Sequence, residues 1–352
     1  MCRLLRKTIK LKAIDFFCSA GGVSCGFRKA GINVLGGIDI DKKCKKTYEK
    51  NIKAKFLHAD VSVLKKEKLI KYFNITQNQD DLLFVGCSPC QYYSNIKTDK
   101  TKSSKTRLLL ADFQEFVDYY RPGYVFIENV PGLDKKNGSP LADFKEFLTD
   151  KGYFFSDGVL NAKHYGVPQN RRRYILIASR INRVITLPKP DKENIKTVKD
   201  AIGDKKIFIP IKAGTIDKTH FIHTSSALSS INLKRIKLTP KNGGGRISWA
   251  RIKGLQLDCY QDHNGHTDVY GRMFWDKPSP TITTRFDSLS NGRYGHPDQD
   301  RAISLREGAT LQSFPLSYKF YSKDKNTTAK MIGNAVPPKL ACRIAKSILN
   351  GE

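Results

Sequence analysis

The sequence has few acidic residues, few cysteines and no long apolar run. Asp and Glu number 33 against 62 Lys and Arg among 352 residues, which leaves a formal net charge of +29. Such an excess repels itself unless a polyanion or counterions lie against it, so nucleic acid is the first expected partner and an acidic membrane surface the second. No apolar run approaches the roughly 20 residues that a membrane-spanning helix needs, which argues against a membrane protein.

Cysteine is also scarce. Eight cysteines in a chain of this length are too few for a disulfide scaffold. The first residues, Met1 to Lys7, are basic and lack the apolar core of a signal peptide. We therefore expect reduced thiols and an intracellular protein. The hydrophobic fraction of 39% and the charged fraction of 27% exclude a disordered or fibrous chain.

Short apolar runs alternate with amphipathic stretches over the first half of the chain. The expected strands lie at 12–17, 33–38, 81–86, 124–128 and 173–178. Helical patterns cover 43–51, 108–120 and 140–151. Runs this short and apolar are typical of strands buried on both faces of a parallel sheet. The alternation therefore predicts an α/β fold with right-handed crossovers.

The pattern changes after about residue 180. Residues 181–275 are rich in Lys, Asn, Gly and Ser, and the triplet Gly243-Gly244-Gly245 marks a loop. This region predicts a second, irregular and mostly β lobe. An amphipathic helix over 337–349 is expected to close the chain.

A turn of small residues follows the first expected strand. Gly21 and Gly22 let the backbone approach a ligand, although a plain tight turn would have the same composition. Asp39 ends the second strand and Asp60 another short one. Acidic residues at strand ends bind the ribose hydroxyls of adenosine-bearing cofactors in α/β proteins. Together these features predict a nucleoside cofactor.

A second motif, Gly86-Cys87-Ser88-Pro89-Cys90-Gln91, follows a buried strand and would present a thiol at its carboxyl end. Cys87 and Cys90 could instead form a redox pair or half of a zinc site. A redox pair of the thioredoxin kind belongs at a helix N-terminus, and zinc needs two more ligands. The missing ligands could come from the pairs His220-x-x-His223 and His263-x-x-His266, so a zinc site stays an alternative.

Two further motifs carry charge beside expected strands. Glu128, in Phe126-Ile127-Glu128-Asn129-Val130-Pro131, ends an apolar strand and could hold or donate a proton, or could cap the following turn. The run Gln169-Asn170-Arg171-Arg172-Arg173 opens the next strand. Arginine forks suit carbonyl and phosphate oxygens, while a solvated charged run is the alternative.

These motifs, in this order, resemble the C5-cytosine DNA methyltransferases of the prokaryotic restriction–modification type. The match continues through Arg301 to Glu307 and the segment Leu311-Gln312-Ser313-Phe314-Pro315, and it closes with Ile332-Gly333-Asn334-Ala335-Val336-Pro337-Pro338. It covers nearly the whole chain except 181–275. The Asp/Asn-Pro-Pro-aromatic motif of methyltransferases that act on exocyclic nitrogen is not found in the sequence.

The resemblance implies a Rossmann-like S-adenosylmethionine-dependent methyltransferase sheet with a second, smaller, mostly β target-recognition lobe. We expect residues 1–185 with 328–352 to form the catalytic and cofactor-binding domain. Residues 186–327 should form the small domain, with target recognition in about 181–275.

The resemblance also implies a mechanism. The methyl group of S-adenosylmethionine would pass to C5 of a cytosine flipped out of a specific short duplex sequence, through a covalent bond between Cys90 and C6. S-adenosylhomocysteine would be the second product. Glu128 would bind the N3/N4 edge of the base, and Arg173 with Arg171 would stabilise charge near O2 or a phosphate. No metal is expected.

Ligand contacts carry over position by position. The cofactor contacts implied are Phe17, Ser19, Gly21, Gly22, Asp39, Ile40, Asp60, Val61, Pro89, Asn334, Ala335 and Val336. The DNA contacts expected are Gln91, Ser94, Lys97, Lys102, Lys105, Gln169, Arg246, Arg251, Lys253, Arg272 and Arg285.

The sequence departs from the family in two places. Ser19 replaces the usual glycine, which we expect to be tolerated if its φ is negative, and the stretch 92–107 contains no glycine.

The expected partner is double-stranded DNA, with a cognate restriction endonuclease acting separately and no membrane. A monomer in the cytoplasm, associated with the nucleoid of a prokaryote or serving a phage, fits this interpretation. A tRNA cytosine-C5 methyltransferase of the same lineage would share every catalytic motif. A non-catalytic DNA-binding protein would be expected to lose Cys90 or Glu128, and both are present.

Overall fold

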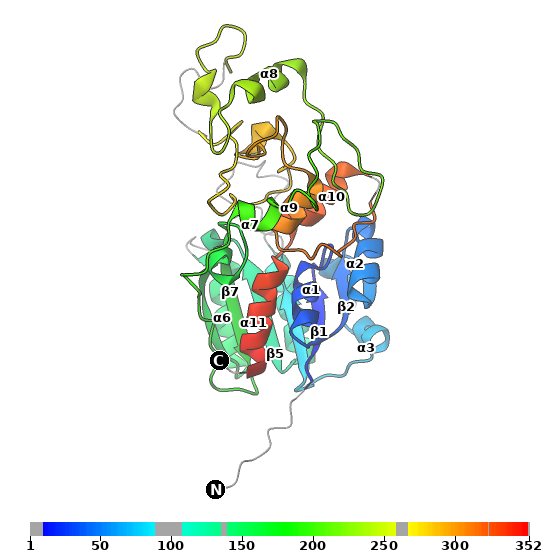
Figure 1. The fold of residues 1–352 in the computed structure, drawn as a ribbon. Helices are drawn as coiled ribbons and strands as arrows, with labels where there is room; N and C mark the ends of the chain where they lie inside the picture. The colour runs from blue at the N-terminus through cyan, green and yellow to red at the C-terminus, as the bar shows by residue number, and fades with distance from the viewer. Residues whose placement is uncertain (1–9, 89–107, 135–138, 258–266, 323, 351–352) are drawn as a thin grey trace. The chain divides into compact units, whose positions relative to one another are not determined.

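A computed structural model describes residues 10–88, 108–134, 139–257, 267–322 and 324–350 (Figure 1). The chain divides into two compact units. Unit 1 comprises Met1–Leu160, Arg172–Lys189 and Ala341–Glu352, and unit 2 comprises Asn161–Arg171 and Pro190–Leu340. The sequence placed the return to the first domain at residue 328, whereas the chain here rejoins unit 1 at Ala341. The difference arises because the helix Lys325–Asn334 packs against Leu305–Leu311 within unit 2.

Unit 1 is built on a seven-stranded sheet of order β3-β2-β1-β4-β5-β7-β6. Its strands are β1 (Lys12–Phe16), β2 (Asn33–Asp39), β3 (Lys55–His58), β4 (Leu82–Gly86), β5 (Tyr124–Asn129), β6 (Phe154–Asn161) and β7 (Arg172–Ser179). Pairing is parallel from β3 through β5. The expected all-parallel sheet is wrong at β7, which runs antiparallel to β5. An apolar run reads alike in either direction, so the sequence could not distinguish the two.

Helices cover both faces of this sheet. In chain order the α-helices of the described residues are α1 (Gly22–Lys29), α2 (Lys45–Ile52), α3 (Lys68–Phe73), α5 (Leu109–Tyr120), α6 (Pro140–Asp150), α7 (Val198–Ile202), α8 (Ser230–Leu238), α9 (Leu305–Leu311), α10 (Lys325–Asn334) and α11 (Pro338–Asn350). Within the described residues, no helix has the length and apolar character needed to span a bilayer.

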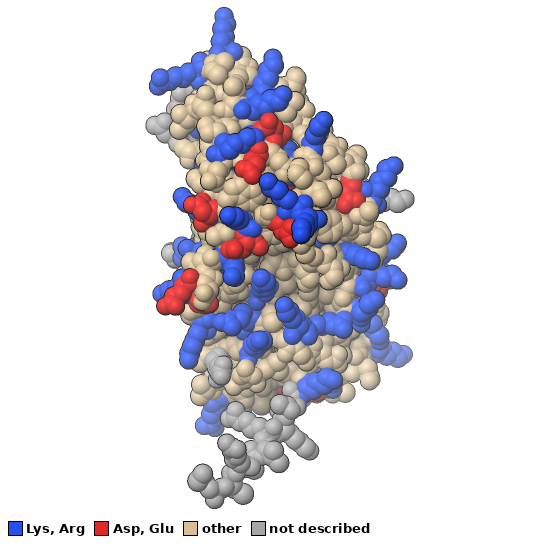
Figure 2. Space-filling model, viewed as in Figure 1, with Lys and Arg blue, Asp and Glu red and all other residues tan. Residues whose placement is uncertain are grey.

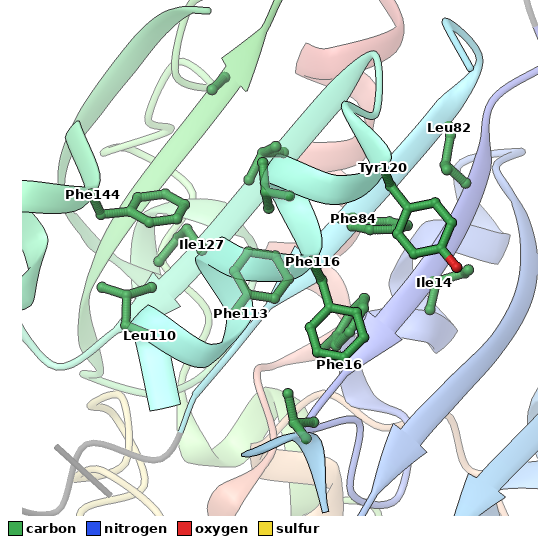
Figure 3. Packing of buried hydrophobic residues seen from close by; sticks show 14 of the residues in the cluster. Ile14, Phe16, Leu82, Phe84, Leu110, Phe113, Phe116, Tyr120, Ile127 and Phe144 are labelled. Atoms are coloured by element: carbon green, nitrogen blue, oxygen red, sulfur yellow. The ribbon is translucent and has the colours of Figure 1, made fainter. Parts of the chain in front are cut away.

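Strand alternation assigns side chains to the two faces. Along β1, Ile14 and Phe16 join the core that contains α5, while Asp15 between them reaches α1 through Ser24. The α5 side is packed with aromatic rings (Figure 3). The Phe16 ring lies 5.1 Å from Phe113 and 5.3 Å from Phe116, both in edge-to-face arrangements. This core fixes the strand ends that carry the polar motifs.

Unit 2 corrects the expectation of a mostly β lobe. Its described part contains α7, α8, α9 and α10 with short 3-10 turns, and its β pairing consists of isolated bridges such as Arg272 with Gly295. The many Gly, Asn and Lys residues favour loops over strands. A fully buried ion pair stabilises it, with Arg301 Nη1 and Nη2 each 2.7 Å from a carboxylate oxygen of Glu307. Burial opposes ionisation, yet Arg301 lowers the pKa of Glu307 to about 2.

Candidate active site

The polar motifs of unit 1 meet at the carboxyl edge of the parallel strands. Strand order reverses between β1 and β4, because β2 and β3 continue on one side and β5 on the other. In open α/β sheets the crevice at such a reversal binds ligands. Since β7 is antiparallel, its first residues lie at the same edge, where Tyr174 pairs with Asn129.

The turn after β1 has a strained backbone. Phe17, Ser19 and Gly21 have φ values of 60°, 46° and 85°. The condition under which the serine was expected to be tolerated, a negative φ, is not met: the serine holds the left-handed conformation that glycine would adopt more easily. A Cβ on Gly21 would lie 2.9 Å from Ile52 and 3.0 Å from Tyr48. The turn therefore requires glycine at 21 for space as well as for conformation.

Asp39 holds this turn to the end of β2. Its Oδ2 accepts the backbone N–H of Ser19 at 2.8 Å, and its Oδ1 accepts that of Asp41 at 2.8 Å. Burial raises the pKa of Asp39, and the two N–H donors oppose this. A carboxylate has about four acceptor positions, so capacity remains for hydroxyl groups of a ligand. Ile40, the next residue, is 63% exposed and offers an apolar surface beside the carboxylate.

Asp60 and Val61 have local partners as well. Asp60 caps the 3-10 turn Val61–Val63, and its Oδ1 accepts from Ser62 N at 3.0 Å and from Ser62 Oγ at 2.8 Å. Val61 packs into the core on the α5 side. Val63, which the sequence did not single out, is 78% exposed. A contact to a ligand from Val61 would therefore come from its backbone.

One buried network beneath the turn was missed from the sequence. Ser24 Oγ donates to Asp15 Oδ2 at 2.6 Å and lies 2.9 Å from the hydroxyl of Tyr48. Burial raises the pKa of Asp15 to about 7, although the Ser24 hydrogen bond lowers it. This chain joins β1, α1 and α2 directly below the strained turn. A polar residue inside an apolar strand was the signal available.

The ends of β4 and β5 are tied together. Asn129 Nδ2 lies 3.3 Å from Ser88 O and 3.4 Å from Ser88 Oγ, immediately before Pro89. Burial and the nearby charge of Glu128 raise the pKa of Cys87 well above its ordinary value. Cys87 is therefore a thiol at neutral pH, which disfavours it as a nucleophile or as half of a redox pair. Cys90 lies outside the described residues.

Glu128 and Arg173 form an ion pair at this edge. Arg173 Nε lies 3.0 Å from Glu128 Oε1, and their side chains are 16% and 11% exposed. Burial lowers the pKa of Arg173 while Glu128 opposes the shift. Arg173 also donates from Nη1 to Arg172 O at 2.7 Å. The antiparallel direction of β7 brings the two charges together at this edge.

Arg171 and Gln169 have structural tasks instead. Arg171 is 3% exposed and donates to the carbonyls of Ile282, Gly333 and Ala335 at 3.1–3.2 Å. Gln169 is fully buried and bonds Gln312 and the Ile282 N–H. We therefore correct the expectation that Arg171 acts beside Arg173 and that Gln169 contacts DNA. Both brace unit 2, including the segment Asn334 to Val336, in which Asn334 is exposed.

The expected DNA-contacting residues divide by exposure. Arg272 is fully buried and donates to four backbone carbonyls and to Asp300, which corrects its assignment as a reader of bases. Arg246 is 8% exposed. Arg251, Lys253 and Arg285 are exposed. Gln91, Ser94, Lys97, Lys102 and Lys105 lie outside the described residues.

The histidines do not assemble a metal site in the described part of the chain, where no group of three or more His, Cys, Asp and Glu could hold an ion. Both ring nitrogens of His223 lie 2.9 Å from hydrogen-bond partners, Ser304 Oγ and Ile209 O. His263 and His266 lie outside the described residues.

Comparison with known proteins places this geometry in a family. The sequence model described as C-5 cytosine-specific DNA methylase matches residues 11–350. Type II methylase M.HgiDII of Herpetosiphon aurantiacus is 38% identical over 342 residues, which cover 95% of this chain and 94% of that protein. Type II methyltransferase M1.HphI of Haemophilus parahaemolyticus is 32% identical over 97% of this chain and 87% of its own length.

Solved structures share the fold. A DNA modification methyltransferase encoded within a prophage, from E. coli, aligns with a TM-score of 0.74 at 22% identity, over 97% of this chain and 99% of that one. The methyltransferase EhMeth of Entamoeba histolytica aligns with a TM-score of 0.67 at 15% identity, over 97% and 98%. From the family match over nearly its whole length, the chain belongs to the C-5 cytosine-specific DNA methylases and is a methyltransferase.

Proposed function

We propose that the protein methylates C5 of one cytosine within a short, specific duplex DNA sequence, as the modification enzyme of a Type II restriction–modification system. The observation that carries the proposal is the Glu128–Arg173 pair at the carboxyl edge of the sheet, beside the end of β4 from which the Cys90 segment leaves. A carboxylate and a guanidinium held together can bind neighbouring groups on the Watson–Crick edge of one cytosine, the carboxylate at N3 and N4 and the guanidinium at O2.

The residues of the β1 and β2 ends fit S-adenosylmethionine. Asp39 retains acceptor capacity for ribose hydroxyls, and exposed Ile40 offers an apolar surface for an adenine ring. Gly21 lets the backbone of the turn come close to a ligand. When it is bound, S-adenosylmethionine supplies the electrophilic methyl group. We infer that Asp60 and the segment Asn334 to Val336 add contacts, as the family pattern implies.

The chain's own residues activate the base. The Cys90 thiolate adds to C6 of the cytosine, which makes C5 nucleophilic; later loss of the C5 proton and departure of Cys90 restore the aromatic ring. Glu128 holds the N3/N4 edge and stabilises the ring as it takes up a proton at N3. Arg173 stabilises charge at O2. A base stacked in a duplex cannot reach these groups, so the target cytosine must flip out.

The Asn129–Ser88 contact supports the placement of the nucleophile. It fixes the residue that precedes Pro89-Cys90 against the strand that carries Glu128. Ser88, which lies shortly before the proposed nucleophile, and the proposed base-binding carboxylate of Glu128 are therefore both fixed by β5. Because Cys87 is kept as a thiol by burial and by Glu128, we assign nucleophilic attack to Cys90.

One experiment tests the proposal. The purified protein is incubated with S-adenosylmethionine tritiated in the methyl group and with genomic DNA or total tRNA, and the modified base is then mapped. We expect 5-methylcytosine in DNA at one sequence context. Label in tRNA alone, or label on an exocyclic nitrogen, would overturn the proposal.

We also infer that a separate endonuclease recognises the same DNA sequence. The methyltransferase would act in the cell compartment that contains the cellular or phage DNA.

A further inference from the structure

A carboxyl group lies buried beneath the turn that we assign to the cofactor. Asp15, the fourth residue of β1, is 2% exposed, and its Oδ2 accepts a hydrogen bond from Ser24 Oγ at 2.6 Å. Ser24 is the third residue of α1, and its backbone N–H also stabilises the carboxylate. The N-cap of α1 is Gly21, which has no side chain for this task. Asp15 therefore caps α1 from inside the sheet.

β1 lies between the two strands whose ends carry the proposed ligand contacts. Asp15 pairs with Gly37 of β2 on one side and with Val85 of β4 on the other. The proposed function assigns the ribose to Asp39 at the end of β2, and the reacting thiol to the chain that follows β4. A group that joins the ribose to the transferred methyl group must therefore cross the end of β1, which comes one residue after Asp15.

Asp15 is coupled to titratable groups at both of these strand ends. Burial raises its pKa to about 7 against the Ser24 hydrogen bonds, and the carboxylate of Asp39 adds to the rise. Burial also raises the pKa of the Cys18 thiol in the turn and of the Cys87 thiol after β4, and the charge of Asp15 contributes to both shifts. A positive charge placed among these groups would therefore act on Asp15.

The helices packed over Asp15 present neutral groups to it. From α1 the hydroxyl of Ser24 faces it, and the hydroxyl of Tyr48 on α2 lies 2.9 Å from Ser24 Oγ. The basic residues of α1, Arg28 and Lys29, are exposed. Among the residues that the structure describes, no cation contributes to the pKa of Asp15. The ionised form of Asp15 is therefore left without a compensating positive charge from these groups.

The proposed methyl donor and its product differ in charge. The sulfur of S-adenosylmethionine is a sulfonium cation, whereas that of S-adenosylhomocysteine is a neutral thioether. Figure 2 shows one side of the protein, where Lys and Arg dominate the charged side chains, and the chain has a net charge of +29. Such a surface repels a cation. Negative charge that favours the donor over the product must therefore come from carboxylates inside the site.

We propose that Asp15 distinguishes donor from product by charge, because its carboxyl group ionises more readily beside the sulfonium of S-adenosylmethionine than beside the neutral sulfur of S-adenosylhomocysteine. The inference rests on the proposed function, which supplies the ligand. Binding of the donor then releases protons from Asp15 to the solvent, and binding of the product does not. When methyl transfer removes the positive charge, Asp15 takes up a proton again. Asp15 is thus a specificity-determining residue that acts through its charge.

The consequence is a preference for the donor that depends on pH. At low pH Asp15 is neutral with either ligand, so the ratio of the product's dissociation constant to the donor's is constant. As pH rises toward 7, Asp15 ionises first in the donor complex, and the ratio increases until the group is ionised in the free protein as well. A sulfonium that lowers the pKa of Asp15 by about 1 would increase the ratio about tenfold.

The test measures the dissociation constants of both ligands by isothermal titration calorimetry between pH 5 and 8, without DNA. The amino and carboxyl groups of the ligands are common to both, so their own titration cancels in the ratio. We expect the ratio to rise about tenfold for wild type and to stay constant for Asp15→Asn, whose amide oxygen can accept from Ser24 but cannot ionise. Titrations of wild type at pH 7 in phosphate and in Tris should show greater proton release with the donor.

Asp157→Asn is the matched control. Asp157 also accepts a hydrogen bond from a hydroxyl group, that of Tyr174 at 2.6 Å, but it belongs to β6, and β4, β5 and β7 lie between β6 and β1. Its ratio should follow wild type. Ser24→Ala provides a second test that keeps the carboxyl group. Because the Ser24 hydrogen bond lowers the pKa of Asp15, its loss should move the rise of the ratio to higher pH.

The outcomes separate this proposal from the proposed function. If wild type binds neither ligand, both fail. If wild type binds both ligands with a ratio that does not change with pH, only the role of Asp15 is refuted. An equal rise in Asp15→Asn, or an unshifted rise in Ser24→Ala, would also overturn it. If Asp15→Asn does not fold, the profiles of wild type and Ser24→Ala still decide the question.

Discussion

The backbone N–H of Ser19 donates to Oδ2 of Asp39 at 2.8 Å, across the ends of β1 and β2. Because Ser19 holds a φ of 46°, its N–H direction depends on a conformation that most residues avoid. The carboxylate that we assign to the ribose therefore also holds the cofactor turn. Conformation of the turn and orientation of the ligand acceptor are coupled through one hydrogen bond.

Ser19→Gly should stabilise the fold. The left-handed conformation costs a non-glycine residue about 1–2 kcal/mol, and the added freedom of glycine when unfolded offsets about 0.5–1 kcal/mol of the gain. We expect the free energy of unfolding to rise by up to about 1 kcal/mol in urea titrations, with cofactor affinity retained. Ser19→Val should have a lower free energy of unfolding than wild type, because a β-branched residue tolerates this φ poorly. Equal stability of the two variants would contradict this account.

Asp39→Ala should weaken S-adenosylmethionine binding by roughly 1.5–3 kcal/mol, the range for a hydrogen bond to a charged group. The acceptor for the Ser19 and Asp41 N–H groups is lost as well. Isothermal titration calorimetry measures the change. Asp41→Ala serves for comparison, since Asp41 caps the turn Lys42–Cys44 and is not among the assigned cofactor contacts. Unchanged affinity in Asp39→Ala would remove the ribose assignment.

Asp15 should make stability depend on pH. Its pKa is raised by burial from an ordinary 3.8 to about 7, so the folded state holds a proton that the unfolded state releases between these values. Its contribution is fully present below pH 4 and is lost as pH rises through 7, by up to roughly 4 kcal/mol. Asp15→Asn keeps an acceptor for Ser24 and should flatten this part of the profile. Parallel profiles for wild type and variant, from chemical denaturation between pH 5 and 8, would refute it.

Much of this arrangement could be predicted from the sequence, because strand ends in an α/β protein carry its ligand contacts. The runs that became β1, β2, β4, β5 and β7 were all found within one or two residues. The direction of β7 was not, since its apolar pattern is symmetric. That direction decides where Arg173 lies, so the sequence alone does not show that Arg173 pairs with Glu128.

The roles predicted for side chains were wrong at the place where the chain passes from one unit to the other. Arg171 and Arg173 alternate along one basic run, and the sequence treats them alike. Yet the boundary falls between Arg171 and Arg172, so Arg171 braces unit 2 while Arg173 pairs with Glu128. Burial of Arg272 was equally invisible, because a lone arginine in a loop-rich region resembles a surface contact. Long-range hydrogen bonds to backbone carbonyls leave no mark in local composition.

The two cysteines of the C-x-x-C motif should behave differently. Cys90→Ser should abolish methyl transfer while DNA binding stays near wild type, because only the covalent step is removed. Cys87→Ala should retain turnover, since burial and Glu128 keep that thiol protonated. Single-turnover assays with tritiated donor, beside gel-shift measurements, check both. Substantial turnover in Cys90→Ser with loss in Cys87→Ala would move the nucleophile to Cys87.

A duplex with 5-fluorocytosine at the target base should trap the enzyme, but only with S-adenosylmethionine present. In the proposed mechanism Cys90 adds to C6 and the methyl group passes to C5, where fluorine then occupies the position of the departing proton. Fluorine cannot leave as a cation, so elimination stops and the sulfur–carbon bond persists through denaturation. Peptide mapping should find the cross-link on Cys90.

The same trap separates the remaining alternatives. A redox pair would form no adduct that depends on the methyl donor, and a non-catalytic DNA-binding protein would form none. A methyltransferase acting on the exocyclic amino group would release its product. The matched control is a duplex with unmodified cytosine at the same position, which should be methylated and released. If the protein methylates that duplex yet forms no adduct with the fluorinated one, attack at C6 is wrong.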